Sequence, residues 1–221
     1  MSKHGLNLPE VIEKHDAGRA VASLRNYYWS RYPGDQPSEQ KSYTGAWFDE
    51  FDPSGTRSSH PNEFTADDLV SVELLSVRVP GVAVRRLLLD PDFGKQITDL
   101  LERIPVGMPI WDAREPVDED WAPWRLENLL RSVDRIDVTT ASKLIARKRP
   151  NLYPVNDKVV RKLVRPDSAP KDWSFVGAIQ GAFQDGDLRE FLAKVRQKAG
   201  LPDAVPLLRI FDVLAWMQIK G

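Results

Sequence analysis

The chain has 221 residues and carries 31 Lys and Arg against 32 Asp and Glu, a formal net charge of −1. This length suffices for one large domain or for two small lobes. The absence of cysteine excludes disulfides and cysteine-bound iron–sulfur clusters, and His4, His15 and His60 are too scattered for a zinc site. No apolar signal core or membrane-spanning run is present, so we expect a cytoplasmic protein without membrane contact, metal or cofactor.

Helical periodicity runs through most of the chain and strand-like alternation is scarce, which predicts an all-α fold. Thr65, followed by Asp67 and Asp68, is typical of a helix N-terminus. Loops at 33–42 and 52–62 are rich in Gly, Pro and Ser, so we expect them to be flexible. Outside the segment described next, the helices are predicted at 9–28, 65–77, 82–89, 93–104, 121–133, 171–183, 188–199 and 204–219.

The most informative segment is 133–163, VDRIDVTTASKLIARKRPNLYPVNDKVVRKL. It predicts a tight turn and then a short helix that begins near Val138. Pro150 and Pro154 break that helix and bracket an extended loop. Asp157 follows at a position typical of an N-cap, and a second helix is expected to begin after it.

This part of the chain is also strongly basic. Residues 143–165 hold eight basic residues against one acidic residue, so the rest of the chain carries a net charge of −8. Such an asymmetry predicts a basic face on an otherwise acidic body, which suits binding to a phosphate polymer. The alternative is a solvated helix surface without a partner. The basic residues of the two helices are Lys143, Arg147 and Lys148, then Lys158, Arg161, Lys162 and Arg165.

The segment resembles the helix-hairpin-helix superfamily of DNA glycosylases, which includes endonuclease III and the adenine and alkyladenine glycosylases. In that family a hairpin leads into Thr-Ala on the second helix, and a catalytic Asp follows a proline-containing loop. The resemblance implies that Asp157 is this catalytic residue. Thr139, eighteen residues before it, stands where bifunctional members carry a lysine nucleophile. The resembling residues are Val133, Ile136, Val138, Thr140, Ala141, Leu144, Ile145, Pro150, Pro154, Val155, Asp157 and Arg161.

The hairpin itself departs from the family's pattern. Arg135 and Asp137 stand at the positions of the two hairpin glycines, and Asp134 replaces the proline. Those glycines let backbone N–H groups approach a DNA phosphate closely. Arg135 could supply a side-chain contact instead, whereas Asp137 would repel a phosphate and is expected to cap the following helix. The end of the chain, LLRIFDVLAWM, also looks like a motif found in a family of short, uncharacterised bacterial proteins.

The resemblance implies a two-lobed, helix-hairpin-helix glycosylase-like fold. Residues 1–60 and 166–221 would pair as one helical lobe, and residues 61–165 would form the helix-hairpin-helix lobe. The implied function is a monomeric, monofunctional DNA glycosylase that releases a damaged or modified base from double-stranded DNA and leaves an abasic site. It would serve repair, or antiviral defence against phages with hypermodified bases. Asp157 would stabilise the oxocarbenium ion and activate water, without lyase activity.

A glycosylase must flip a nucleotide out of the duplex and hold its base between aromatic or apolar walls. Candidates for this base pocket are Trp111, Trp121 and Trp124, which precede the hairpin and could equally belong to the core. Two other interpretations remain: a non-catalytic helical DNA-binding protein in which Asp157 only caps its helix, and a helical protein-interaction module. For DNA phosphates, the expected contacts are Arg135, Lys143, Arg147, Lys158 and Arg161.

Overall fold

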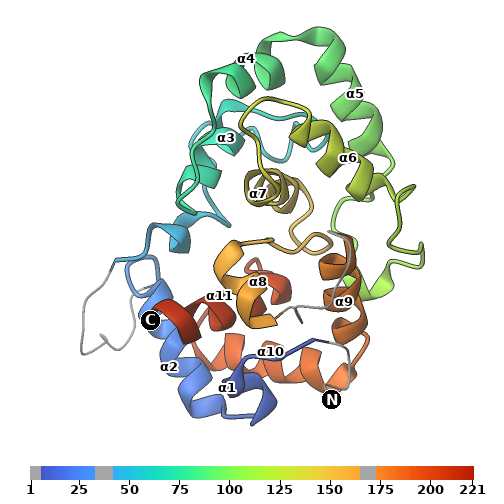
Figure 1. The fold of residues 1–221 in the computed structure, drawn as a ribbon. Helices are drawn as coiled ribbons and strands as arrows, with labels where there is room; N and C mark the ends of the chain where they lie inside the picture. The colour runs from blue at the N-terminus through green and yellow to red at the C-terminus, as the bar shows by residue number, and fades with distance from the viewer. Residues whose placement is uncertain (1–5, 33–41, 165–172) are drawn as a thin grey trace. The chain divides into compact units, whose positions relative to one another are not determined.

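The computed structural model describes residues 6–32, 42–164 and 173–221, and all regular elements within these ranges are helices (Figure 1). The predicted all-α class is therefore confirmed. No helix in these ranges has both the length and the apolar character needed to cross a bilayer. Most of the expected loop 33–42, the basic residue Arg165 and the first two residues of the expected helix 171–183 lie outside the described residues.

The chain forms two compact units. Unit 1 consists of Met1–Ala46 and Asp157–Gly221, and unit 2 consists of Trp47–Asn156. The helices of unit 2 are α3 (Ala66–Glu73), α4 (Gly81–Leu89), α5 (Pro91–Glu102), the short 3₁₀ helix η2 (Ile110–Asp112), α6 (Ala122–Arg131) and α7 (Val138–Lys148). A second 3₁₀ helix, η1 (Thr44–Trp47), ends at the first residue of this unit.

Helix α7 is the central helix of unit 2. It packs against α3 and α6, while α5 packs against α6 and α4. Figure 1 shows α7 end on, with α3 and α6 beside it. Every residue of α7 from Thr139 to Lys148 is buried, although this stretch includes two threonines, a serine and three basic residues. A helix that is enclosed on all sides must satisfy these polar groups internally, because an unpaired buried polar group is costly.

Two helix starts follow the prediction from sequence. Thr65 accepts a hydrogen bond from the backbone N–H of Asp68, and the Asp68 carboxylate accepts one from the Thr65 N–H, which completes a capping box on α3. The Asp137 carboxylate accepts the backbone N–H of Thr140 at 2.9 Å and caps α7. Both predicted caps are confirmed.

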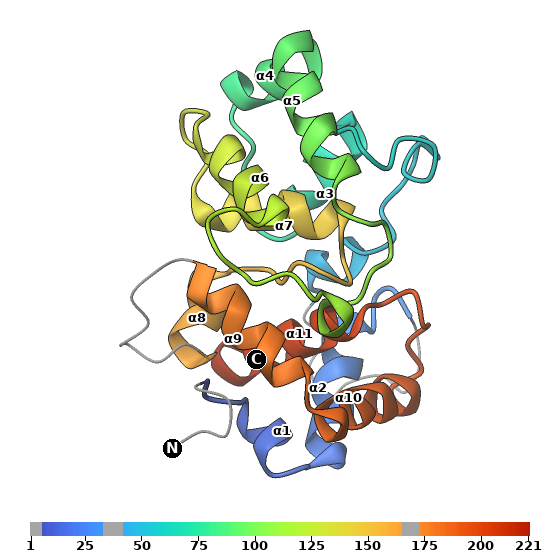
Figure 2. The same ribbon diagram turned by 90° about the vertical axis from the view of Figure 1, so that its right-hand side faces the viewer.

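Unit 1 joins the two ends of the described chain. Its helices are α1 (Glu10–Glu13), α2 (Ala17–Tyr28), α8 (Lys158–Val164), α9 (Trp173–Phe183), α10 (Gly186–Lys198) and α11 (Leu207–Lys220). Helix α2 packs against α10 and α11, and α8 packs against α11 (Figure 2). The helix expected at 9–28 is interrupted, because His15 adopts a left-handed φ of 51° and Asp16 caps a new helix.

A buried arginine ties α11 to the N-terminal part of unit 1. The guanidinium of Arg209 donates to the Tyr27 hydroxyl at 2.7 Å and to the carbonyl of Gly45 at 3.0 Å. It also pairs with the buried carboxylate of Asp212. These bonds join three segments that are distant in the sequence.

The units divide the chain at 46/47 and 156/157, whereas the resemblance led us to expect divisions at 60/61 and 165/166. Helix α8 belongs to unit 1 because it packs against α11. The segment after residue 46 belongs to unit 2 because cations of α7 bind its backbone: Arg147 reaches the carbonyl of Phe48 at 3.0 Å, and Lys148 reaches that of His60 at 3.0 Å. The loop 52–62, expected to be flexible, is thus anchored at its end to α7.

Candidate active site

Asp157 lies at the start of α8 and is partly exposed. Its carboxylate oxygen Oδ1 accepts the backbone N–H of Val159 at 2.8 Å, and its carbonyl accepts the N–H of Arg161 at 2.8 Å. The N-cap position predicted from the sequence is therefore confirmed. The cap fixes one oxygen of the carboxylate relative to the first turn of the helix.

The loop that leads to Asp157 is held at several points within unit 2. The backbone carbonyl of Asn151 accepts the N–H of Ile110 at 2.9 Å. The hydroxyl of Tyr153 donates to the buried carboxylate of Glu127 on α6 at 2.6 Å. The Tyr153 ring stacks on Trp121, with ring centroids 6.0 Å apart and planes 22° apart. Side chains as well as backbone bonds thus fix this proline-containing loop.

The last residue of the loop, Asn156, is bound by two hydroxyl groups of α7. Thr139 Oγ1 donates to the Asn156 carbonyl at 3.2 Å. Ser142 Oγ accepts the Asn156 N–H at 3.0 Å and donates to the carbonyl of Thr139 at 3.0 Å. We did not single out Ser142 or Asn156 from the sequence. One signal in the sequence could have indicated them. Thr139 and Ser142 are small hydroxyl residues about one turn apart on a helix that has apolar residues on more than one face, which is typical of a buried helix whose hydroxyls bind other parts of the protein.

The turn between α6 and α7 has an unusual backbone at Arg135. This residue adopts a left-handed φ of 65°, and the N–H of Ile136 closes the turn onto the carbonyl of Val133 at 3.1 Å. A left-handed φ costs a non-glycine residue free energy, so glycine favours such positions. The Arg135 side chain is 79% exposed and lies 3.6 Å from the carboxylate of Asp134.

Two of the expected phosphate contacts are inside the protein. Lys143 and Arg147 are only 2% and 1% exposed. The ammonium of Lys143 donates to the carbonyl of Leu75 at 2.8 Å, and the guanidinium of Arg147 lies 3.1 Å from the carboxylate of Asp68. Their expected place on an exposed basic face is wrong, because α7 is enclosed by α3, α6 and the segment after residue 46.

The next two basic residues are buried as well. Lys148 lies 2.5 Å from the second carboxylate oxygen of Asp68. Burial lowers the pKa of Lys148, and the charge of Asp68 opposes this shift. The Arg149 guanidinium donates to the carbonyls of Leu101 and Ile104 at 2.6 and 2.7 Å. Four of the eight basic residues in 143–165 therefore bind carbonyl and carboxylate groups inside unit 2.

This burial changes where the positive charge of the chain lies. Unit 2 has 14 Lys and Arg against 19 Asp and Glu, whereas unit 1 has 17 against 13. Without its buried charged residues, unit 2 presents 10 basic residues against 16 acidic ones. The excess of positive charge therefore belongs to unit 1, where Lys158 and Lys162 of α8 are exposed and Arg161 is partly exposed.

Two of the three tryptophans proposed for a base pocket are core residues. Trp121 and Trp124 are 4% and 7% exposed, and Trp121 is stacked on Tyr153. This burial favours the alternative stated from the sequence, that these two residues belong to the core. Trp111 in η2 is partly exposed.

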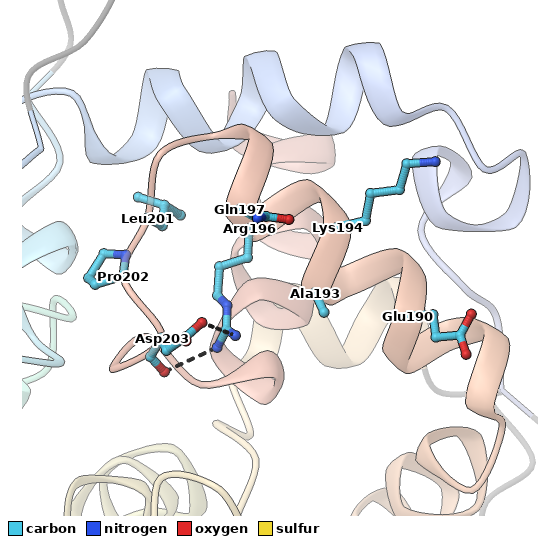
Figure 3. A pocket seen from close by; sticks show the side chains of 8 residues that line it. All are labelled: Glu190, Ala193, Lys194, Arg196, Gln197, Leu201, Pro202 and Asp203. Carbon is cyan, nitrogen blue, oxygen red and sulfur yellow. Dashed lines mark hydrogen bonds and ion pairs between the residues drawn. The ribbon is translucent and has the colours of Figure 1, made fainter.

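A shallow pocket of about 660 Å³ lies elsewhere, on the flank of α10 in unit 1 (Figure 3). The residues that line it carry both positive and negative charges. Lys194 and Glu190 lie on α10, and Arg196 forms an ion pair with Asp203 at 2.5 Å. None of the residues predicted for the site lines it. Nowhere in the described ranges do three or more His, Asp or Glu side chains gather so that they could hold a metal ion.

The chain was compared with known proteins and protein families. Neither the curated proteins nor the solved structures contain a match to this chain. Among protein families, the one described as "Family of unknown function (DUF6308)" matches residues 20–219, which is nearly the whole chain. The chain therefore belongs to the DUF6308 family.

Proposed function

We propose that the protein is a monofunctional DNA glycosylase with a two-lobed, helix-hairpin-helix glycosylase-like fold. One observation carries this proposal: the turn between α6 and α7 is left-handed at Arg135, and an anchored loop then leads from α7 to Asp157. The resemblance places a hairpin glycine at Arg135 and the catalytic carboxylate at Asp157. The turn thus keeps a glycine-like backbone although glycine is absent.

The chemistry requires a carboxylate that remains ionised beside the sugar of a flipped nucleotide. As the bond to the base breaks, positive charge develops on the deoxyribose, and a nearby anion stabilises it. The Asp157 carboxylate would provide this charge and would orient the attacking water. Because it is bound through Oδ1 to the Val159 N–H, it is held in place before DNA arrives.

The exposed cations support double-stranded DNA as the partner. Arg135 in the turn is exposed, as is Lys158 on α8, and Arg161 is partly exposed. Contacts of this kind to phosphates supply most of the sequence-independent affinity for DNA. We propose that these three residues contact the backbone and that the protein acts as a cytoplasmic monomer, in repair or in defence against phages with modified bases.

A specific observation favours a second candidate, a non-catalytic DNA-binding protein with the same fold. The Asp157 carboxylate accepts the backbone N–H of Val159, which is the structural use of an N-cap residue. In this case Asp157 would fix the start of α8, and the cations would bind DNA that remains chemically unchanged.

The two candidates are separated by an assay for base release. The protein is incubated with duplexes that each contain one modified base, such as uracil, hypoxanthine or an alkylated purine, and with genomic DNA of phages that carry hypermodified bases. Abasic sites are then revealed as strand breaks after alkali. We expect abasic sites in at least one of these DNAs, and none with the Asp157→Asn variant. Salt-dependent binding without abasic sites in any of the DNAs would support the second candidate instead.

A further inference from the structure

The residue immediately before Asp157 is held by hydrogen bonds to helix α7. Asn156 is 1% exposed, and both its backbone N–H and its backbone carbonyl are bound by hydroxyl groups of α7. These hydroxyls belong to Thr139 and Ser142, which are 6% and 0% exposed. Water has little access to these bonds, so it does not compete for them as it would at a surface.

The carbonyl held by Thr139 belongs to the peptide bond that joins Asn156 to Asp157. A peptide unit is planar, and its plane contains the Cα atom of the following residue. A hydrogen bond to this carbonyl therefore restricts the position of the Asp157 Cα through a rigid group. On the other side of Asp157, its carboxylate is fixed by the N–H of Val159 at 2.8 Å.

Ser142 completes the arrangement from the next turn of the same helix. Its Oγ accepts the N–H of Asn156 and donates to the carbonyl of Thr139, at 3.0 Å in each case. The hydroxyl hydrogen is thus directed to α7 itself, and the oxygen lone pair is directed to the loop. A threonine side chain also has few rotamers in a helix, which keeps the Thr139 hydroxyl in place.

We propose that Thr139 and Ser142 are positioning residues for Asp157, an inference that rests on the proposed glycosylase function. They form a hydroxyl clamp, defined by these two side chains and the backbone of Asn156, that sets where the carboxylate stands relative to the reacting sugar. Small displacements of a catalytic group have large effects on the chemical step, whereas DNA affinity depends on phosphate contacts. The clamp therefore acts on the rate of base release and leaves binding unchanged.

The structure also explains why a hydroxyl residue is useful at position 139. In the resembling family this position belongs to a lysine in the bifunctional members, whose amine must reach the sugar. Here the Thr139 side chain is buried and its hydroxyl donates to the loop backbone. At this position the hydroxyl therefore holds the peptide that precedes the carboxylate.

The test uses single-turnover kinetics on the duplex of the panel above that the wild-type protein processes fastest. Thr139→Val keeps the shape of the side chain and removes the donor, and Ser142→Ala removes the second hydroxyl. Thr139→Ser retains the hydroxyl and serves as the rescue. Ser71→Ala is the matched control, because Ser71 is also fully buried and its hydroxyl also donates to the carbonyl three residues earlier, at 2.8 Å, but it belongs to α3 rather than to α7.

We expect Thr139→Val with Ser142→Ala to slow base release about tenfold or more, while the dissociation constant for the same duplex stays within about twofold. Thr139→Ser and Ser71→Ala should release the base at nearly the wild-type rate. Hydrogen exchange provides a readout independent of activity: the Asn156 amide should exchange much faster in Ser142→Ala and remain protected in Ser71→Ala. Thermal melting shows whether each variant is folded.

The outcomes separate the clamp from the proposed function. If the wild-type protein is active and the folded double variant releases the base at the same rate, the proposed function stands while the clamp is rejected. Equal loss of rate in Thr139→Val and Thr139→Ser would also reject it, because the hydroxyl would then be irrelevant. A wild-type protein that releases no base from any DNA of the panel would reject the proposed function, and the positioning role with it.

Discussion

The guanidinium of Arg147 lies 3.1 Å from the carboxylate of Asp68, and neither side chain has any exposed surface. Lys148 contacts the other oxygen of the same carboxylate, so a single acid faces two buried cations. The remaining donors of Arg147 bind backbone carbonyls, including that of Phe48. This cluster connects α3, α7 and the segment after residue 46, and it is the reason that Arg147 and Lys148 do not face solvent.

Removal of the Asp68 carboxylate should strongly destabilise unit 2. Asp68→Ala leaves two buried cations without their counter-charge, and the loss of one partner from a buried ion pair costs about 3–5 kcal/mol. We expect the free energy of unfolding, measured by urea denaturation, to fall by about this amount. Asp67→Ala is the control, because the Asp67 carboxylate lies near the surface and binds Ser54. A loss for Asp68→Ala as small as that for Asp67→Ala would contradict this role.

Lys148 should make stability depend on pH in the alkaline range. Burial lowers its pKa below the ordinary value of 10.5, so between the two values the unfolded chain binds a proton that the folded chain has released. The free energy of unfolding gains a positive slope with pH wherever the unfolded state binds more protons. Just below pH 10.5, the free energy of unfolding should therefore rise more steeply with pH in the wild-type protein than in Lys148→Met. Equal slopes from urea titrations at several pH values would contradict the lowered pKa.

Asp157→Asn should nearly abolish base release and leave the fold and the DNA affinity close to those of the wild type. The asparagine oxygen can still accept the Val159 N–H, so the cap is retained while the negative charge is lost. The measurement compares single-turnover base release with DNA affinity in the same buffer. Near-normal release by a folded Asp157→Asn protein would rule out the catalytic role.

Charge reversal on α8 should weaken binding to all DNA sequences alike. Lys158→Glu with Arg161→Glu removes two proposed phosphate contacts, and each lost contact on duplex DNA reduces the slope of log affinity against log salt by about 0.9. The control is Lys194→Glu with Lys198→Glu, which makes the same change of net charge on the exposed face of α10. An equal effect from both pairs would show that only net charge matters.

The product should be an intact strand with an abasic site. A lyase needs an amine that attacks the sugar and forms an imine, and the Thr139 hydroxyl cannot do so. The nearest amine on the same helix, that of Lys143, is buried and bound to the carbonyl of Leu75 at 2.8 Å. Borohydride should therefore trap no covalent protein–DNA adduct. A trapped adduct that disappears with Lys143→Ala would overturn this assignment and show a lyase.

The sequence by itself determined the helices and several of their ends. Thr65 with Asp68, and Asp137 with Thr140, are within three residues of each other, so their caps depend only on local backbone geometry. The start of α8 at Asp157 is of the same kind. The break at His15 was missed because the helical periodicity continues across it, although the backbone turns left-handed there.

Only the tertiary structure decided which charged residues face solvent. Lys143, Arg147, Lys148 and Arg149 are basic in the sequence, but most of the groups that they bind are carbonyls and a carboxylate that lie from 45 to 99 positions away in the chain. Arg149 binds the carbonyl of Ile104, 45 residues away, and Arg147 binds that of Phe48, 99 residues away. A local pattern identifies a cation but not the acceptors that surround it. Burial depends on those acceptors, because a charge remains inside a protein only where distant parts of the chain supply bonds to replace water.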